Sequence, residues 1–193
     1  IENVHQFHLP VVVALNRFTG DTDAEIACVQ DKCDYLGVKV VPCNHWAEGG
    51  AGAEELAHEV VDLVENHQSD FRYLYNNEET LWNKIKTIAQ TIYGANDILA
   101  EQKLRDKIKD LQEAGYGHLP ICMAKTPASL STDPDLKGRP EGFDVPLRDV
   151  SLSAGAGFIV VLTGHVMTMP GLPKRSAAER IDIDEDGQVV GLF

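Results

Sequence analysis

The first third of the chain alternates short apolar runs with amphipathic segments. Residues 11–15 form a continuous apolar run, typical of a strand buried on both faces of a parallel sheet. Thr22 and Glu25 then form a capping-box pattern, after which apolar residues recur at helical spacing. Residues 38–41 predict a second strand, and residues 53–66 predict a second helix. This order of strand, helix, strand and helix predicts an α/β fold with right-handed crossovers.

The pattern changes after residue 114. Before that point, residues 71–75 predict a strand or an extended connector, and two amphipathic helices follow at 79–92 and 101–114. Beyond it, strand-like runs dominate, which favours antiparallel or mixed β-structure; they lie at 120–125, 145–152, 158–163 and within 181–192. We therefore predict an α/β protein with a Rossmann-like parallel-sheet portion, residues 1–114, and a smaller α+β portion with antiparallel strands, residues 115–193.

Charge and composition narrow the classes of partner. The 193 residues carry a net charge of -13, and such an acidic surface repels phosphate backbones, so we expect no nucleic acid partner. No apolar run could span a bilayer and no signal segment opens the chain, so we expect no membrane contact and a cytoplasmic protein. The four cysteines form no Cys-x-x-Cys pair and are interpreted as reduced, buried thiols, with a zinc site or disulfides as the alternative.

The loop after the first predicted strand, residues 16–22, is the first candidate site. It leaves the carboxyl end of a parallel strand, where open α/β sheets bind ligands. Phe18 is an apolar side chain in a loop that should face solvent, although it could instead fold back onto the core. Asn16 and Arg17 also suggest the guanine-reading motif of GTPases. Thr19 occupies the position that requires an aspartate, so that function is discounted.

The loop after the second predicted strand, residues 44–50, is the second candidate site. Trp46 lies beside glycines there, an arrangement that can offer a flat face to a planar ring, although a tryptophan lid on the core is the alternative. Both loops leave the carboxyl ends of neighbouring strands and should lie side by side. Phe18 and Trp46 together therefore predict a slot for a flat heterocycle, with His45 as a polar neighbour.

Other motifs do not complete a catalytic set. Residues 182–187 match the opening of a calcium loop, but the position that requires a bidentate glutamate is Phe193, so a hairpin turn is the preferred interpretation. The glycines at 155 and 157 precede a strand rather than a helix, unlike a dinucleotide fingerprint. Lys125 and Thr126 could touch a phosphate, but no glycine-rich cradle precedes them, and no Gly-x-x-x-x-Gly-Lys-Ser/Thr occurs in the sequence.

Several segments, taken in order, resemble formate–tetrahydrofolate ligases (formyltetrahydrofolate synthetases). The apolar run with Asn16-Arg17-Phe18 and the Trp46-Ala47-Glu48-Gly49-Gly50 segment carry the resemblance most clearly. It continues through the whole chain, at residues 21–25, 92–95, 115–120, 123–126, 152–157, 167–173, 181–184 and 191–193. The resemblance implies an enzyme that uses ATP to join formate to tetrahydrofolate through formyl phosphate, which the N10 amine of tetrahydrofolate then attacks.

The resemblance also implies roles for particular residues. The two aromatic rings that sandwich the folate in this family correspond to Phe18 and Trp46, and a third residue by that pocket corresponds to Pro42. We place Asn16 and Thr19 among the folate-binding residues as well. Relatives often have Phe-Pro where this chain has Phe18-Thr19, so the wall of the pocket differs here.

The resemblance implies a longer protein. The family is about three times the length of this chain, and its phosphate-binding loop and its arginine for formyl phosphate lie upstream. The opening at Ile1, with no methionine, suggests a piece of a longer chain. ATP with magnesium, a monovalent cation and a homotetramer are expected of the complete enzyme, and the catalytic residues are expected outside this chain. We expect the fragment alone to be inactive. The alternative is a non-catalytic folate-binding module, or a subunit that needs a separate N-terminal chain.

Overall fold

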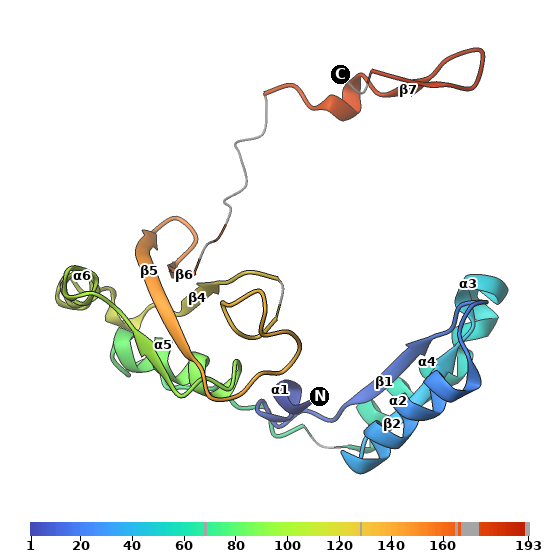
Figure 1. Cartoon of the computed structure of the whole chain (residues 1–193), viewed down its shortest axis with the longest axis horizontal. Helices are drawn as coiled ribbons and strands as arrows, with labels where there is room; N and C mark the ends of the chain where they lie inside the picture. Colours follow the sequence, from blue (N-terminus) through green and yellow to red (C-terminus); the bar gives the residue numbers. More distant parts are fainter. Residues whose placement is uncertain (68, 128, 165, 167–173, 192–193) are drawn as a thin grey trace.

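The structure is a computed structural model of the chain that describes every residue except 68, 128, 165, 167–173 and 192–193. The motif at 167–173 and the last two residues therefore lie outside the described residues. Figure 1 shows the elements. In chain order these are α1 (Glu2–His5), β1 (Val12–Asn16), α2 (Asp23–Tyr35), β2 (Lys39–Cys43), α3 (His45–Glu48), η1 (Gly49–Ala53), α4 (Glu54–Asn66), α5 (Leu81–Thr91), β3 (Asp97–Leu99), α6 (Gln102–Glu113), η2 (Tyr116–His118), β4 (Ile121–Ala124), β5 (Asp144–Ser153), β6 (Phe158–Thr163), η3 (Ala177–Glu179), β7 (Asp182–Ile183) and β8 (Val189–Val190).

The first unit is a parallel pair of strands, β1 and β2, with helices α2 and α4. The strands are in register from Val12 beside Lys39 to Asn16 beside Cys43. The predicted capping box opens α2: the Glu25 amide donates to Thr22 Oγ1 at 3.3 Å, and the Thr22 amide donates to Glu25 Oε2 at 2.9 Å. These two bonds satisfy donors that a helix start otherwise leaves free. The α/β prediction for this part of the chain is confirmed.

The prediction that the first strand is buried on both faces is wrong. β1 has no buried residue, and Ala14 and Asn16 are exposed. The reason is that β1 pairs only with β2 among the described strands. Helix α2 packs on β2, where Val41 and Cys43 are fully buried, and α4 packs on both strands. An apolar run that is typical of an internal strand therefore lies at the edge of a two-stranded sheet in this structure.

The second unit is a four-stranded mixed sheet with the order β3-β5-β6-β4. β3 and β5 are parallel, β5 and β6 are antiparallel, and β4 and β6 are parallel. The predicted change to mixed β-structure is therefore confirmed. Helices α5 and α6 pack on this sheet, where Ile85, Ile108, Val145 and Ile159 form part of one buried cluster. The division at residue 114 stays a prediction.

The end of the described chain forms the predicted hairpin. β7 and β8 pair antiparallel, and the Asp184 amide donates to the Gln188 carbonyl at 3.0 Å. The Asp184 carboxylate accepts from the amides of Asp186 and Gln188, so it organises the turn. Gly187 has a φ of 77°, the left-handed conformation that glycine adopts without strain. Within the described residues, no group of three or more His, Cys, Asp or Glu is arranged to hold a metal ion.

Two connecting segments run side by side between the first and second units. The Arg72 amide donates to the Phe7 carbonyl at 3.2 Å, and the Phe7 and Phe71 rings are stacked with centroids 6.1 Å apart. Residues 71–75 therefore form a connector, with a bend at residues 74–75, rather than a strand. Of the helices in the described parts of the chain, none has both the length and the apolar character to cross a membrane.

The cysteines differ from one another in exposure. Cys33 and Cys43 are buried free thiols, as predicted. Cys28 and Cys122 are also free but exposed, so the prediction of four buried thiols is half wrong. Helical spacing alone does not say which face of α2 is covered, and β2 is covered here mainly over Val41 and Cys43.

Lys84 is fully buried in α5, with no exposed surface. Its Nζ donates to the backbone carbonyls of Gly117 at 2.7 Å and Leu119 at 3.2 Å, and lies 5.7 Å from the centre of the Tyr75 ring. The ammonium group thus ties α5 to the turn η2. Because burial disfavours the charged form, the pKa of Lys84 is lowered from its ordinary 10.5.

This lowered pKa predicts a rise in stability at alkaline pH. Between the lowered pKa of Lys84 and 10.5, this lysine binds more protons in the unfolded chain than in the folded chain, so its contribution to the free energy of unfolding should increase with pH. Urea titrations at several alkaline pH values would measure this increase, and a Lys84→Met variant should lack the Lys84 contribution. Parallel curves for the two proteins would contradict the prediction.

Candidate functional site

The ends of β1 and β2 bring the two candidate loops together. Asn16 lies beside Cys43 in the parallel register, and Leu15 lies beside Pro42. The Arg17 amide then donates to the Cys43 carbonyl at 3.0 Å, which extends the pairing beyond the strand. Because parallel strands end at the same edge of a sheet, the loops that follow them start as neighbours.

The Phe18 loop is closed by Asp21. The Phe18 amide donates to Asp21 Oδ2 at 2.8 Å, and the Asp21 amide donates to the Phe18 carbonyl at 3.1 Å. The capping box of α2 follows immediately, and hydrogen bonds from Thr22 hold the pKa of Glu25 below its ordinary value. The side chain of Phe18 is left 55% exposed. It does not fold back onto the core of the described chain.

The Trp46 loop is closed by Gly52. Helix α3 and turn η1 form this loop, and the Asn44 amide donates to the Gly52 carbonyl at 2.9 Å. A Cβ atom on Gly52 would lie 2.4 Å from the carbonyl carbon of Asn44, so only glycine fits this close approach. The turn holds Trp46 outward with 67% of its surface exposed, so Trp46 is not a lid on the core.

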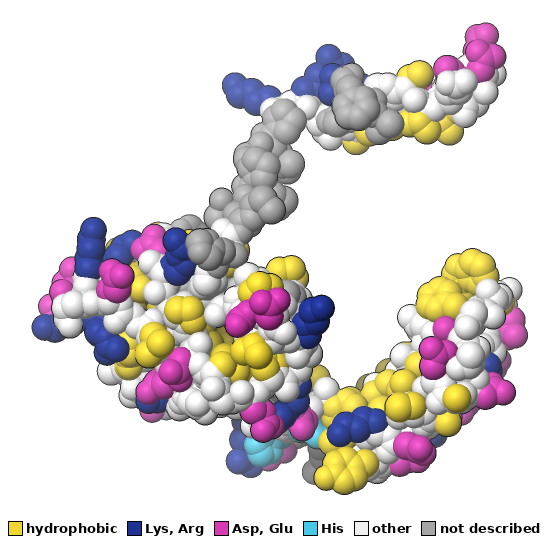
Figure 2. All heavy atoms as spheres, viewed as in Figure 1, with side chains coloured by type: hydrophobic (Ala, Val, Ile, Leu, Met, Phe, Trp, Pro, Cys, Tyr) yellow, Lys and Arg dark blue, Asp and Glu magenta, His cyan; other side chains and the backbone are white. Residues whose placement is uncertain are grey.

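Phe18 and Trp46 contact each other at the exposed end of the first unit. Their ring centroids are 6.2 Å apart and the ring planes are tilted by 57°. Figure 2 shows hydrophobic side chains gathered at this end of the unit, where Figure 1 places α3. A planar ligand held between two aromatic faces requires parallel rings roughly 7 Å apart, twice a van der Waals contact. The two rings must therefore turn before they can hold a ligand between them.

The other predicted folate residues surround this pair at different depths. Asn16 and Thr19 are exposed, and Pro42 is half-buried in β2. His45 is exposed beside Trp46, as expected of a polar neighbour. The sequence thus identified two loops that do meet, and the folate-binding roles of these residues stay predictions.

Comparisons with known proteins identify the family. A model of the family described as formate–tetrahydrofolate ligase matches residues 1–193. The formate–tetrahydrofolate ligase of Sinorhizobium fredii is 53% identical over 193 residues, which cover 100% of this chain and 34% of that protein. Those of Granulibacter bethesdensis and Pelagibacter ubique are 52% and 50% identical with the same coverage. The chain belongs to the formate–tetrahydrofolate ligase family.

The chain spans about one third of the length of these ligases, 34% in each of the three. The family resemblance drawn from the aromatic loops and the later motifs is confirmed. About two thirds of the length of each of these ligases therefore has no counterpart in this chain.

The aromatic pair offers this family member stacking and hydrogen bonding but no complete catalytic set. Arg17 is the nearby cation on the Phe18 loop, and its guanidinium lies 3.9 Å from the Asp23 carboxylate, too far for a hydrogen bond. Neighbouring carboxylates at Asp21 and Glu25 already accept bonds from the loop and from Thr22. The described residues around the pair thus form a candidate binding surface without an assembled catalytic set.

Lys125, another candidate from the sequence, is committed to its own loop. Its Nζ donates to the backbone carbonyls of Thr126, Ser129 and Ser131. These bonds account for all three hydrogens of an ammonium group. Burial lowers the pKa of Lys125. The structure therefore gives Lys125 the role of organising this loop rather than that of touching a phosphate.

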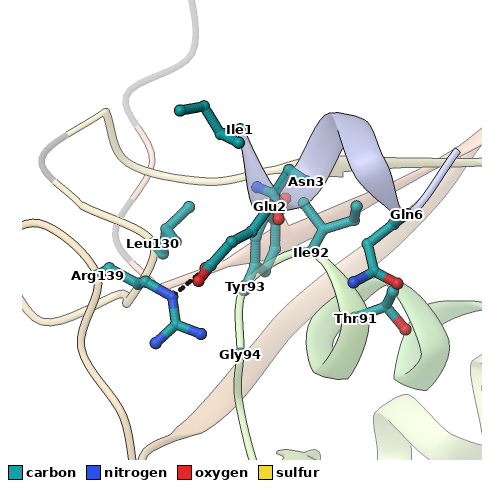
Figure 3. A pocket seen from close by; sticks show the side chains of 10 residues that line it. All are labelled: Ile1, Glu2, Asn3, Gln6, Thr91, Ile92, Tyr93, Gly94, Leu130 and Arg139. Atoms are coloured by element: carbon teal, nitrogen blue, oxygen red, sulfur yellow. Dashed lines mark hydrogen bonds and ion pairs between the residues drawn. The ribbon is translucent and has the colours of Figure 1, made fainter. Parts of the chain in front are cut away.

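A separate cavity of about 450 Å³ lies where α1 meets the end of α5. In Figure 3, Glu2 points toward Arg139 across this cavity, and the two side chains form an ion pair. Arg139 Nη1 also pairs with Glu141 at 2.5 Å. No local sequence pattern marks this cluster, because Glu2 and Arg139 are 137 residues apart in the chain.

Proposed function

We propose that this chain supplies the folate-stacking half-site of an ATP-dependent ligase. That ligase joins formate to tetrahydrofolate through formyl phosphate and gives 10-formyltetrahydrofolate. The observation that carries the proposal is the contact of Phe18 with Trp46, on adjacent loops at the ends of parallel strands, in a chain whose whole length matches this family.

Stacking gives the two rings their proposed role. Each aromatic face on a flat ligand contributes about 0.5–1.5 kcal/mol beyond the burial of its area. Both rings are already exposed, so a ligand buries apolar surface without breaking the core. Half-buried Pro42 would form part of the pocket wall, while Asn16 and Thr19 offer polar atoms at its edge.

The described residues around the aromatic pair do not assemble a site for ATP with magnesium. The sequence has no Gly-x-x-x-x-Gly-Lys-Ser/Thr loop, and the described residues include no metal-binding cluster. Stabilising a transferring phosphoryl group requires lysine, arginine and magnesium contacts that this chain does not assemble around the aromatic pair. We therefore assign no phosphoryl-transfer step, and no monovalent cation, to these residues.

Replacing Trp46 by alanine tests the stacking proposal. Loss of one face and its buried area should weaken tetrahydrofolate binding about tenfold or more, since about 1.4 kcal/mol corresponds to a factor of ten. Folate binding to the parent would be followed by the fluorescence of Trp46 in the 193-residue chain with the Trp82→Phe substitution. Folate binding to the Trp46→Ala variant would be measured by calorimetry. Tyr35→Ala removes an exposed aromatic ring from α2 and is the matched control.

The kinetic counterpart uses the Sinorhizobium fredii ligase in which these 193 residues replace the matched third; we call it the chimera. Trp46→Ala in the chimera should raise the KM for tetrahydrofolate far more than the KM for ATP, because the ring contacts only the folate. Equal increases in both constants would count against the assignment.

The isolated chain is expected to be inactive. Because the phosphate-binding residues are proposed to lie outside it, purified 193-residue chain should neither hydrolyse ATP nor form 10-formyltetrahydrofolate. A phosphate-release assay and product detection by absorbance would measure this, with the chimera as the positive control. The isolated chain could bind folate without activity, and a separately expressed remainder of the ligase could then restore the activity. That result would favour the two-subunit alternative over a single polypeptide.

A further inference from the structure

The outer edge of β1 is an open hydrogen-bonding edge. The Arg17 amide donates to Cys43 in β2, so Arg17 directs its backbone groups toward β2. Backbone direction alternates along a strand, hence Val13 and Leu15 also face β2, while Val12, Ala14 and Asn16 direct their N–H and C=O groups outward. Among the described strands, none pairs with this outer edge.

This edge lacks the features that protect exposed edges. Natural edge strands carry charged residues, prolines or bulges that prevent pairing with another chain. The sequence of β1 is Val-Val-Ala-Leu-Asn, with no charge and no proline, and no irregularity interrupts its register with β2. A strand of this composition is typical of the interior of a parallel sheet, where neighbours lie on both sides.

Apolar side chains of the same unit are also exposed. β2 has the buried residues Val41 and Cys43, whereas β1 has none. Helix α4, which packs on both strands, leaves Val60, Val61 and Val64 exposed. Figure 2 shows hydrophobic side chains along the part of this unit where Figure 1 places β1. Apolar surface on two elements is therefore left without a cover.

We propose that the outer edge of β1 pairs in parallel with a strand from the two thirds of the ligase that lie outside this chain. The length of the relatives supports this occupant, since this chain spans 34% of each. A parallel partner matches the β1–β2 pair and would extend one sheet with all its carboxyl ends at the Phe18 and Trp46 loops. The new strand and the elements beside it would cover β1 and the valines of α4.

Hydrogen exchange at single amides tests this pairing. In the 193-residue chain, the amide of Ala14 should exchange freely, while those of Val13 and Leu15, which bond to β2, should be slowed. In the chimera, the Ala14 amide should become at least about 100-fold slower, as a bonded amide in an internal strand does. Mass spectrometry with electron-transfer fragmentation resolves neighbouring residues, and Val13 and Leu15 serve as internal controls.

Two outcomes would overturn the proposal. The first is an Ala14 amide that exchanges as fast in the chimera as in the isolated chain. The second is protection of Ala14 in the isolated chain that grows with concentration and does not increase further in the chimera, because this would identify a second copy as the partner. The inference rests on family membership and strand pairing, so it can fail while folate stacking holds, and the reverse.

A proline variant gives a second measurement. Ala14→Pro removes an outward N–H and leaves the bonds of Val13 and Leu15 to β2, a position that edge strands tolerate. The Tm of the chimera should fall by several degrees more than that of the isolated chain. Val13→Pro, which removes a β1–β2 bond, should lower the stability of β1–β2 in both proteins. An equal loss from Ala14→Pro in both would contradict the pairing.

Discussion

Replacing Lys84 by alanine is expected to lower the free energy of unfolding of the four-stranded unit by about 2–4 kcal/mol. The substitution removes three buried methylene groups at about 0.8 kcal/mol each and leaves a cavity in the core. It also removes the donor to the carbonyls of Gly117 and Leu119, and an unsatisfied buried acceptor costs about 1–3 kcal/mol. Relief from burying a charge offsets part of this loss.

Lys84→Met and Lys86→Ala are the matched comparisons for this prediction. Methionine keeps most of the buried stem and removes only the ammonium, so its effect should be smaller than that of alanine. Lys86 lies on the same helix in a partly exposed ion pair with Asp97, 3.0 Å away, and such a pair contributes less than about 1 kcal/mol. Urea unfolding followed by Trp82 fluorescence in a Trp46→Phe background would measure all three. A Lys84→Ala effect no larger than that of Lys86→Ala would contradict the role of Lys84.

The sequence predicted those parts of the fold that depend on local physics. The capping box of Thr22 and Glu25 identified the start of α2, because both hydrogen bonds lie within four residues. The turn at Gly187 was identified in the same way, since a hairpin needs a residue that adopts the left-handed conformation. The α5 and α6 helices were found within two residues of their ends because their apolar faces recur at helical spacing.

The parts that it did not predict depend on partners distant in sequence. In the sequence, Lys84 resembles an ordinary surface lysine on an amphipathic helix. Its ammonium group can be buried because η2, more than 30 residues later, supplies a backbone carbonyl that accepts its hydrogen bond. The strand β3 has three residues and follows a turn, so it has no periodicity of its own, and its pairing with β5 defines it. The apolar run of β1 has the composition of an internal strand, but burial depends on neighbouring elements, and among the described strands only β2 pairs with β1.

The candidate site lies between these two cases. Strand order placed the loops of Phe18 and Trp46 side by side, because parallel strands in register end at one edge. The sequence did not say how the rings would meet at a tilt of 57°, since their placement depends on the backbone of two turns, which Asp21 and Gly52 close. Those two residues position the aromatic rings without belonging to the predicted folate contacts.

Substituting Gly52 by alanine is therefore expected to disturb the aromatic pair without altering either ring. The added Cβ would lie 2.4 Å from the Asn44 carbonyl carbon and 2.6 Å from the His45 nitrogen, and both are backbone atoms that cannot move aside cheaply. Overpacking of this kind costs about 1–3 kcal/mol. The bond from Asn44 to Gly52 should weaken, and the turn that carries Trp46 should shift with it.

Gly50→Ala is the control for this substitution. Gly50 lies in the same turn, but a Cβ atom there meets nothing within 4 Å, so its effect should stay within about 0.5 kcal/mol. Unfolding of the first unit would be followed by Trp46 fluorescence in a Trp82→Phe background, and the near-ultraviolet dichroism of Trp46 would report the change in ring contact. If both glycine variants gave the same stability and the same Trp46 spectrum, the close approach at Gly52 would not hold the ring in place. A loss confined to Gly52→Ala would make the backbone contact, rather than the flexibility of a glycine-rich loop, the reason that Trp46 faces Phe18.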